Sequence, residues 1–177
     1  MSTDRVGDSR EERLALAFSQ HVVCLQTLFE QAIAPALSAQ GLTTAELDVL
    51  AALRSVGVPY QLRPKELAAR LLLTTGGLSN VLRRLEARGL VSRIPDPSDG
   101  RSHNVRLTPT GVTTAQLTTA AATTALQQVL TAVPAATLED TLIQLRAILA
   151  TVADSQVGTL AFRYLPEPGG PDCPTVG

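Results

Sequence analysis

The 177-residue chain contains no tryptophan, and its other aromatic residues are only three phenylalanines and two tyrosines. Its core must therefore be aliphatic. The two cysteines, Cys24 and Cys173, lie far apart in the sequence. Such a pair provides neither a disulfide framework nor a cluster of metal ligands. We therefore expect no structural metal and no cofactor, in a chain whose length fits one domain or one domain with an appended arm.

Two further absences concern membranes and export. The opening segment, MSTDRVGDSREER, is polar and charged throughout, whereas a signal peptide has a basic start followed by an apolar run. No stretch approaches the ~20 apolar residues of a membrane-spanning helix. Together with the few cysteines, these absences predict a soluble, reduced, cytoplasmic protein with no membrane partner.

Positive and negative charges nearly balance, with a net charge of −1, but they are unevenly distributed along the chain. The segment from Leu62 to Arg106 has a net charge of +5, and the remainder has −6. The nine basic residues of the segment from Leu62 to Arg106 are Arg63, Lys65, Arg70, Arg83, Arg84, Arg88, Arg93, Arg101 and Arg106. This asymmetry predicts a basic face on an acidic body, which favours contact with nucleic acid.

The spacing of leucine and alanine predicts a mainly helical protein. Residues 11–39 form a long amphipathic helix, in which Pro35 should produce a kink or an early end and Gly41 a stop. Its apolar stripe comprises Leu14, Phe18, Val22, Leu25, Phe29 and Ile33. A second helix follows, with Thr43 and Glu46 spaced as a capping box, and it should reach about Arg54. The next residues, SVGVPYQLR, are expected to form a loop.

A short third helix should begin at Pro64, and a fourth after Thr74 or Thr75. The fourth helix, GGLSNVLRRLEARG, has one apolar face and one polar face. The apolar face holds Leu78, Val81, Leu82 and Leu85, and the polar face holds Gly76, Ser79, Asn80, Arg83 and Arg84.

Two strands, LVSRI and SHNVRL, should then form a hairpin. Thr108 and Pro109 start a fifth helix that is expected to run to about Val133, and Pro134 precedes a sixth. From about Ser155 the chain becomes rich in proline and glycine, and its end is expected to be disordered.

Helix, helix, turn, helix and hairpin, in that order, predict a winged helix-turn-helix. A helix that enters the major groove needs an apolar side facing the body and short polar residues with arginines facing the bases. The fourth helix meets both needs, and Gly76 and Gly77 would let its first N–H groups approach a phosphate. Arg101, just past the hairpin tip, is expected to enter the minor groove, with Asp99 orienting it.

Residues 42–111 resemble the MarR family of bacterial transcription regulators. The most diagnostic segments are RLEARGLVSR, DPSDGR and VRLTPTG, in that order. The resemblance implies that Ser79, Asn80 and Arg84 contact DNA from the recognition helix and that Arg101 does so from the wing. Thr75, Gly76, Arg83, Arg93 and Asp99 complete the expected set. Two positions depart from the family pattern: Gly100, often arginine in relatives, and Arg83, often acidic.

The resemblance also implies a homodimer without enzymatic activity, bound to a palindromic operator in double-stranded DNA. Residues 1–40 and 109–154 would supply the dimerisation helices, and residues 42–109 the winged helix-turn-helix. Residues 155–177 would form the tail. The resulting fold class is mainly α with a small β-wing, in a DNA-binding regulator that is typically a repressor released by a ligand.

The resemblance further suggests a small aromatic or anionic effector, for which His21, Leu25 and Arg54 are the candidate binding residues. Alternatives are redox sensing through Cys24, or an effector-free winged-helix protein with an architectural or protein-binding role. A hydrolase built on His21 or His103 is a further alternative. It lacks a nucleophile elbow, a phosphate loop and metal-ligand spacing.

Overall fold

The computed structural model describes residues 9–71, 73–96 and 99–155, which form six α-helices and one three-stranded sheet. The helices are α1 (Arg10–Gln40), α2 (Thr44–Ser55), α3 (Pro64–Leu71), α4 (Thr75–Ala87), α5 (Pro109–Leu130) and α6 (Ala135–Ser155). The strands are β1 (Gln61–Leu62), β2 (Val91–Asp96) and β3 (Asp99–Leu107). The predicted fold class, mainly α with a small β-wing, is confirmed. The expected tail falls almost wholly outside the described residues.

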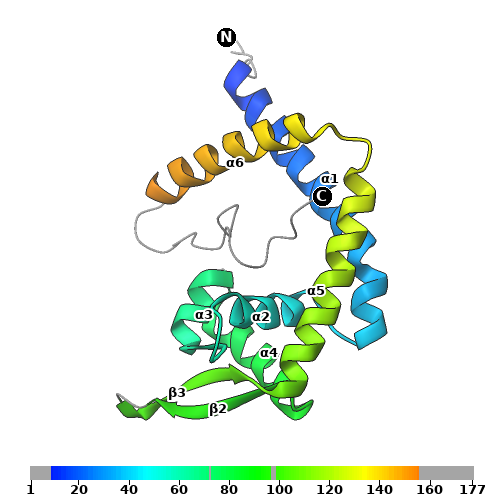
Figure 1. Ribbon diagram of the computed structural model, residues 1–177. Coiled ribbons are helices and arrows are strands. Elements are labelled where there is room, and N and C mark those ends of the chain that lie inside the picture. Colours follow the sequence, from blue (N-terminus) through cyan, green and yellow to red (C-terminus); the bar gives the residue numbers. More distant parts are fainter. Residues whose placement is uncertain (1–8, 72, 97–98, 156–177) are drawn as a thin grey trace, which may run out of the picture.

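The chain has a compact lower part and an elongated upper part (Figure 1). Helices α2, α3 and α4 gather with the sheet in the lower part, and the β2–β3 hairpin projects from it. Helices α1 and α5 pack side by side and rise above it, and α6 extends from the upper end of α5. The winged helix-turn-helix is therefore held at one end of a long helical arm.

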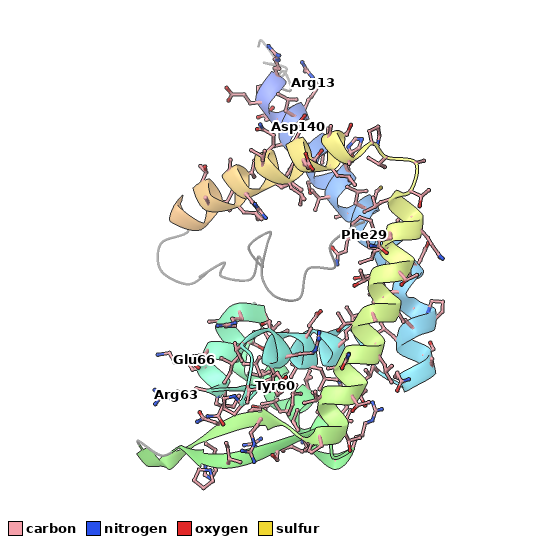
Figure 2. All side chains as sticks on the ribbon, in the orientation of Figure 1. Arg13, Phe29, Tyr60, Arg63, Glu66 and Asp140 are labelled. Carbon is pink, nitrogen blue, oxygen red and sulfur yellow. The ribbon has the colours of Figure 1, made fainter. Side chains whose placement is uncertain are left out.

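Side-chain caps begin several of the helices. Thr43 and Glu46 form the predicted capping box of α2, and Ser9 and Glu12 form a second one at α1. At α3, Glu66 Oε2 accepts a hydrogen bond from the backbone N–H of Arg63 at 3.0 Å, and Figure 2 shows both residues on the outer side of the body. These contacts satisfy N–H groups that the first turn of a helix leaves without partners.

The sheet has the order β1-β3-β2, with antiparallel pairing throughout. Val91, the first residue of β2, pairs with Leu107, the last residue of β3. The base of the hairpin therefore lies next to the start of α5, which follows β3. Gly111 in the first turn of α5 lies so close to Leu90 that an added Cβ would come within 1.9 Å of the Leu90 carbonyl oxygen. A glycine is needed there because the start of α5 packs against the backbone that leads into β2.

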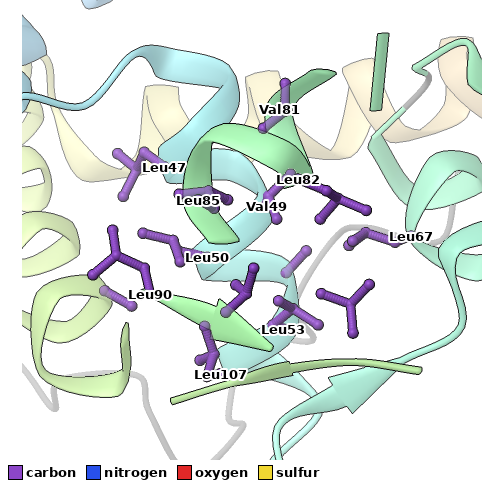
Figure 3. Close-up of a cluster of buried hydrophobic side chains, with 14 of the residues drawn as sticks. Leu47, Val49, Leu50, Leu53, Leu67, Val81, Leu82, Leu85, Leu90 and Leu107 are labelled. Carbon is purple, nitrogen blue, oxygen red and sulfur yellow. The ribbon is translucent and has the colours of Figure 1, made fainter. Parts of the chain in front are cut away.

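The hydrophobic core lies within the winged helix-turn-helix. Leu50, Leu53, Leu67 and Leu85 are each 0% exposed, and Val105 of β3 is 1% exposed. Figure 3 shows Val81, Leu82 and Leu85 of α4 among the leucines of α2. The fully buried core that joins the helices and the wing is thus made of aliphatic side chains, as the scarcity of aromatic residues requires.

Three details differ from the sequence prediction. Helix α1 does not end early at Pro35 but continues to Gln40, because Leu37 is buried against the core, and Gly41 closes the helix as predicted. The expected loop before Pro64 contains β1, a two-residue strand that pairs with β3 and has no periodic pattern to reveal it. Helix α5 ends at Leu130 rather than near Val133.

The expectation that no segment could span a membrane is also corrected. Helix α1 is long and apolar enough to do so by length and composition alone, although core helices of soluble proteins pass the same test. The apolar stripe of its first half is exposed in the single chain: Leu14 is 59% exposed and Leu25 is 47% exposed. This surface has no partner within the described part of the chain, and its apolar character extends to Leu16 and Val23 beside the predicted stripe.

Candidate nucleic-acid interface

Helix α4 separates its side chains into two faces, as its sequence pattern predicts. Leu78, Val81, Leu82 and Leu85 are buried, whereas Gly76, Ser79, Asn80, Arg83 and Arg84 include no buried residue. The Thr74 side chain accepts a hydrogen bond from the Gly77 N–H at 3.1 Å and so starts the helix. Thr74 rather than Thr75 is therefore the N-cap. The polar face is held outward by the leucines on the opposite side.

Two side chains on the polar face interact with each other. Arg83 Nη2 donates a hydrogen bond to Asn80 Oδ1 at 3.1 Å, one turn earlier on the helix. At Gly76 an added Cβ would meet no atom within 4 Å, so packing inside the chain does not require a glycine there. The helix start therefore presents bare backbone to the outside, where a phosphate would be attracted by the N–H groups and the helix dipole.

Arg84 lies at the edge of this face and is tied to the body. Its Nε donates a hydrogen bond to Glu46 Oε1 at 3.0 Å, and its side chain is 54% exposed while that of Glu46 is 4% exposed. Burial raises the pKa of Glu46, but hydrogen bonds from Thr43 and the neighbouring charge of Arg84 lower it by more, so the net shift is downward. Glu46 is therefore a carboxylate at neutral pH.

Two other arginines of the basic segment also bind within the chain. Arg93 Nε donates to Glu86 Oε1 at 2.6 Å, which joins β2 to α4. Arg88 donates through Nη1 to the Gly41 carbonyl at 2.8 Å and through Nη2 to the Gln40 carbonyl at 2.6 Å. The sequence placed Arg88 with Arg83 and Arg84 on a basic helix face, and it could not reveal these partners, because the 47 and 48 residues that separate Arg88 from these carbonyls leave no local signal.

The wing follows α4 directly. Arg101 and Asp99 lie in β3, near the tip of the hairpin, where the pairing shifts register between Pro95 and Asp96. The side chains of Thr75, Asp99 and Arg101 lie outside the described part of the structure. The orienting contact expected between Asp99 and Arg101 remains a prediction, as does the role of Thr75.

The candidate effector and redox residues lie away from α4. His21 and Leu25 are exposed on α1, where His21 Nδ1 lies 2.6 Å from the Ala17 carbonyl oxygen. Arg54 lies in the last turn of α2, where a cation suits the helix dipole. Cys24 is a free, exposed cysteine. The described residues contain no group of three potential metal ligands.

The surface of the described residues includes two hollows. One, of about 490 Å³, lies between residues 58–60, the sheet and the start of α5, and the other, of about 530 Å³, lies at the junction of α5 and α6. Neither is lined by His21, Leu25 or Arg54. The assignment of these three residues to an effector site stays a prediction.

A sequence model of the MarR family matches residues 40–102, from the end of α1 to the wing. This segment of the chain is therefore similar to the MarR family. It is similar to the HTH-type transcriptional regulator PecS of Dickeya dadantii, with 36% identity over 84 residues that cover 48% of this chain and 51% of PecS. It is also similar to the transcriptional activatory protein BadR of Rhodopseudomonas palustris, with 31% identity over 111 residues that cover 63% of each chain.

A solved structure extends the likeness beyond the matched segment. Sco3205, a MarR family transcriptional regulator from Streptomyces coelicolor in complex with DNA, superposes with a TM-score of 0.67 at 26% identity, covering 80% of this chain and 87% of that chain. In the sequence matches, by contrast, the chain spans only 51% of the length of PecS and 63% of the length of BadR.

Proposed function

We propose that the chain is a sequence-specific DNA-binding transcription regulator. The observation that carries this proposal is the outward face of α4, on which Ser79, Asn80 and Arg83 stand beside a wing that contains Arg101. A protein–DNA interface needs short polar groups for base edges and arginines for guanine or phosphate. The structure of Sco3205, solved with DNA, supports the same use of this fold.

Within this proposal, the DNA-facing set is Thr75, Gly76, Ser79, Asn80, Arg83, Arg84, Arg93, Asp99 and Arg101. Its members differ in role. Arg84 and Arg93 each make an ion pair within the chain, so they would contact phosphate while remaining fixed to the body. Arg101 would enter the minor groove from the wing, where the potential is strongly negative.

We further propose a homodimer that binds a palindromic site in double-stranded DNA. Large apolar side chains are exposed on α1 and also on α6, where Ile143 is 58% exposed and Val152 is 47% exposed. An apolar surface of this extent on a soluble chain marks an interaction site. A second copy packed there would cover it and would place two winged domains on one duplex.

The expected mode of action is repression that a small aromatic or anionic effector relieves. His21, Leu25 and Arg54 are the proposed effector contacts, and redox control through the exposed Cys24 is the alternative. The regulator would act in the cytoplasm, on the nucleoid. The proposal assigns it no enzymatic activity and no cofactor, in keeping with relatives that are named as transcriptional regulators.

The test begins with selection of bound duplexes from a random-sequence pool by the wild-type chain. Fluorescence anisotropy over a salt series then compares wild type, Arg101→Ala and Arg10→Ala, the last removing an arginine at the far end of α1. We expect a palindrome, a steep salt dependence, and a slope that falls by about one for Arg101→Ala and stays unchanged for Arg10→Ala. Equal binding of any duplex by all three proteins would contradict the proposal.

A further inference from the structure

Glu46 uses its two carboxylate oxygens for two different tasks. Oε2 accepts a hydrogen bond from the Thr43 N–H at 2.8 Å and completes the capping box of α2. Oε1 accepts one from Arg84 Nε at 3.0 Å, across 38 residues of sequence. One buried side chain therefore connects the first turn of α2 to the helix that presents the polar face.

The bond leaves the outer end of the Arg84 side chain unused. Arg84 is held at Nε while its side chain is 54% exposed. Among the described residues, Glu46 is the only hydrogen-bond partner of the Arg84 side chain. A guanidinium is planar, so a hydrogen bond at Nε restricts the directions in which its two Nη groups can donate. Arg84 is thus oriented before it meets any ligand.

Arg83, its neighbour, is held differently. Its bond goes to Asn80 on the same exposed helix face, so both partners are free to move together in water. Glu46 is 3% exposed and packed beneath α4, and its position is fixed by the core and by the cap of α2. The anchor of Arg84 is therefore rigid, whereas that of Arg83 is not.

We propose that Glu46 is a positioning residue for DNA recognition, which holds the Nη groups of Arg84 in the orientation that binds a phosphate or a guanine. Glu46 itself does not touch DNA. The inference rests on the proposed function and adds to it a residue outside the DNA-facing set. Pre-ordering a long side chain reduces the conformational entropy lost on binding, so the contact gains affinity and directional selectivity.

Glu46→Gln is a sharp test because glutamine also serves in a capping box. Its amide oxygen still accepts the Thr43 N–H, while its NH₂ group cannot accept from Arg84. Glu12→Gln is the matched control, since it makes the same change in the capping box of α1, at the end of the molecule away from α4 (Figure 1). Both substitutions remove one negative charge, so they change the general attraction to DNA by the same amount.

The experiment is a double-mutant cycle of binding to the palindrome selected by the wild-type chain. We expect Glu46→Gln to weaken binding about five- to tenfold in the wild-type background and to have no such effect in an Arg84→Ala background. Arg84→Lys, which keeps the charge but has no Nε–H, should behave like Glu46→Gln. Glu12→Gln should bind like wild type.

A second measurement keeps the proposal independent of folding. Relaxation of ¹⁵N in the Arg84 Nε–H group reports its order directly, and we expect the order parameter to fall in Glu46→Gln while the backbone values of α4 stay unchanged. The same cost of Glu46→Gln in both arginine backgrounds, or an unchanged Nε–H order parameter, would overturn the proposal. If Arg84→Ala binds like wild type while Arg101→Ala does not, the positioning role fails and the regulator function stands.

Discussion

The guanidinium of Arg88, which caps the end of α4, binds the carbonyl oxygen of Gly41, which caps the end of α1. Through the same group it also binds Gln40, so one side chain supplies two donors to the C-terminal end of a 31-residue helix. A cation is favourable there because the helix dipole is negative at that end. The long helix and the proposed recognition helix are therefore joined directly at their ends.

Replacing Arg88 tests the contact between the ends of α1 and α4. We expect Arg88→Ala to lower the free energy of unfolding by about 1 kcal/mol, because charged hydrogen bonds are lost at an exposed site. DNA affinity should fall as well, since α4 loses its tie to α1. Urea unfolding and anisotropy measure the two effects. Arg10→Ala, which removes a cation from the unfavourable N-terminal end of α1, should leave stability unchanged or slightly higher, and an equal loss there would refute the dipole argument.

We expect the same substitution, glycine to alanine, to affect stability differently at two positions. Gly111→Ala should destabilise the fold by about 2 kcal/mol or more, because its Cβ would lie 1.9 Å from the Leu90 carbonyl oxygen. Gly76→Ala meets no atom within 4 Å and lies in the first turn of α4, so it should be neutral or stabilising by up to about 0.5 kcal/mol.

For DNA binding, in contrast to stability, we expect Gly76→Ala to be harmful. A methyl group at position 76 would separate the backbone N–H groups of α4 from a phosphate, so we expect Gly76→Ala to weaken DNA binding about fivefold while the protein stays fully folded. Thermal unfolding and anisotropy on the same samples separate the two properties. Wild-type affinity for Gly76→Ala would show that the start of α4 does not approach DNA.

Local sequence signals predicted most of the fold. The spacing of Thr43 and Glu46 identified a capping box, Pro109 marked the start of a helix, and the leucines of α4 defined its buried face. What sequence reasoning missed depends on distant contacts. Strand β1 exists because Leu62 pairs with Val105, and helix α1 does not end early at Pro35 because its far end is anchored by Leu37.

The candidate site shows the same division. The polar face of α4 could be predicted from helical periodicity, since it is the complement of the apolar face. The ion pairs of Arg84 and Arg93 could not be predicted, because their partners come from other elements of the fold. Glu46 was correctly predicted as a cap, but only the packing of α4 onto α2 shows that the same carboxylate also binds an arginine.

The exposed stripe of α1 gives a prediction for assembly. Leu14→Glu would place a carboxylate in the proposed dimer interface, where burying an unpaired charge is costly, so we expect the chain to become monomeric at micromolar concentration. Light scattering after size-exclusion chromatography measures the mass. Val58→Glu is the control, because Val58 is 82% exposed on the loop before β1. A dimer that persists in Leu14→Glu would place the interface elsewhere.

The lowered pKa of Glu46 predicts how stability depends on pH. A carboxylate whose pKa is lower in the folded state stabilises the fold above its ordinary pKa of 4.5, and this contribution is lost as the pH falls through the folded value. The free energy of unfolding of wild type should therefore exceed that of Glu46→Gln by a constant amount, about 1 kcal/mol, above pH 5. The difference should shrink as the pH approaches 3.

Asp48 on the same helix, whose pKa is raised because burial reduces its hydration, is present in both proteins and cancels in the comparison. Urea unfolding at intervals of half a pH unit measures the difference. A gap that stays constant down to pH 3 would mean that Glu46 contributes through packing and not through its charge.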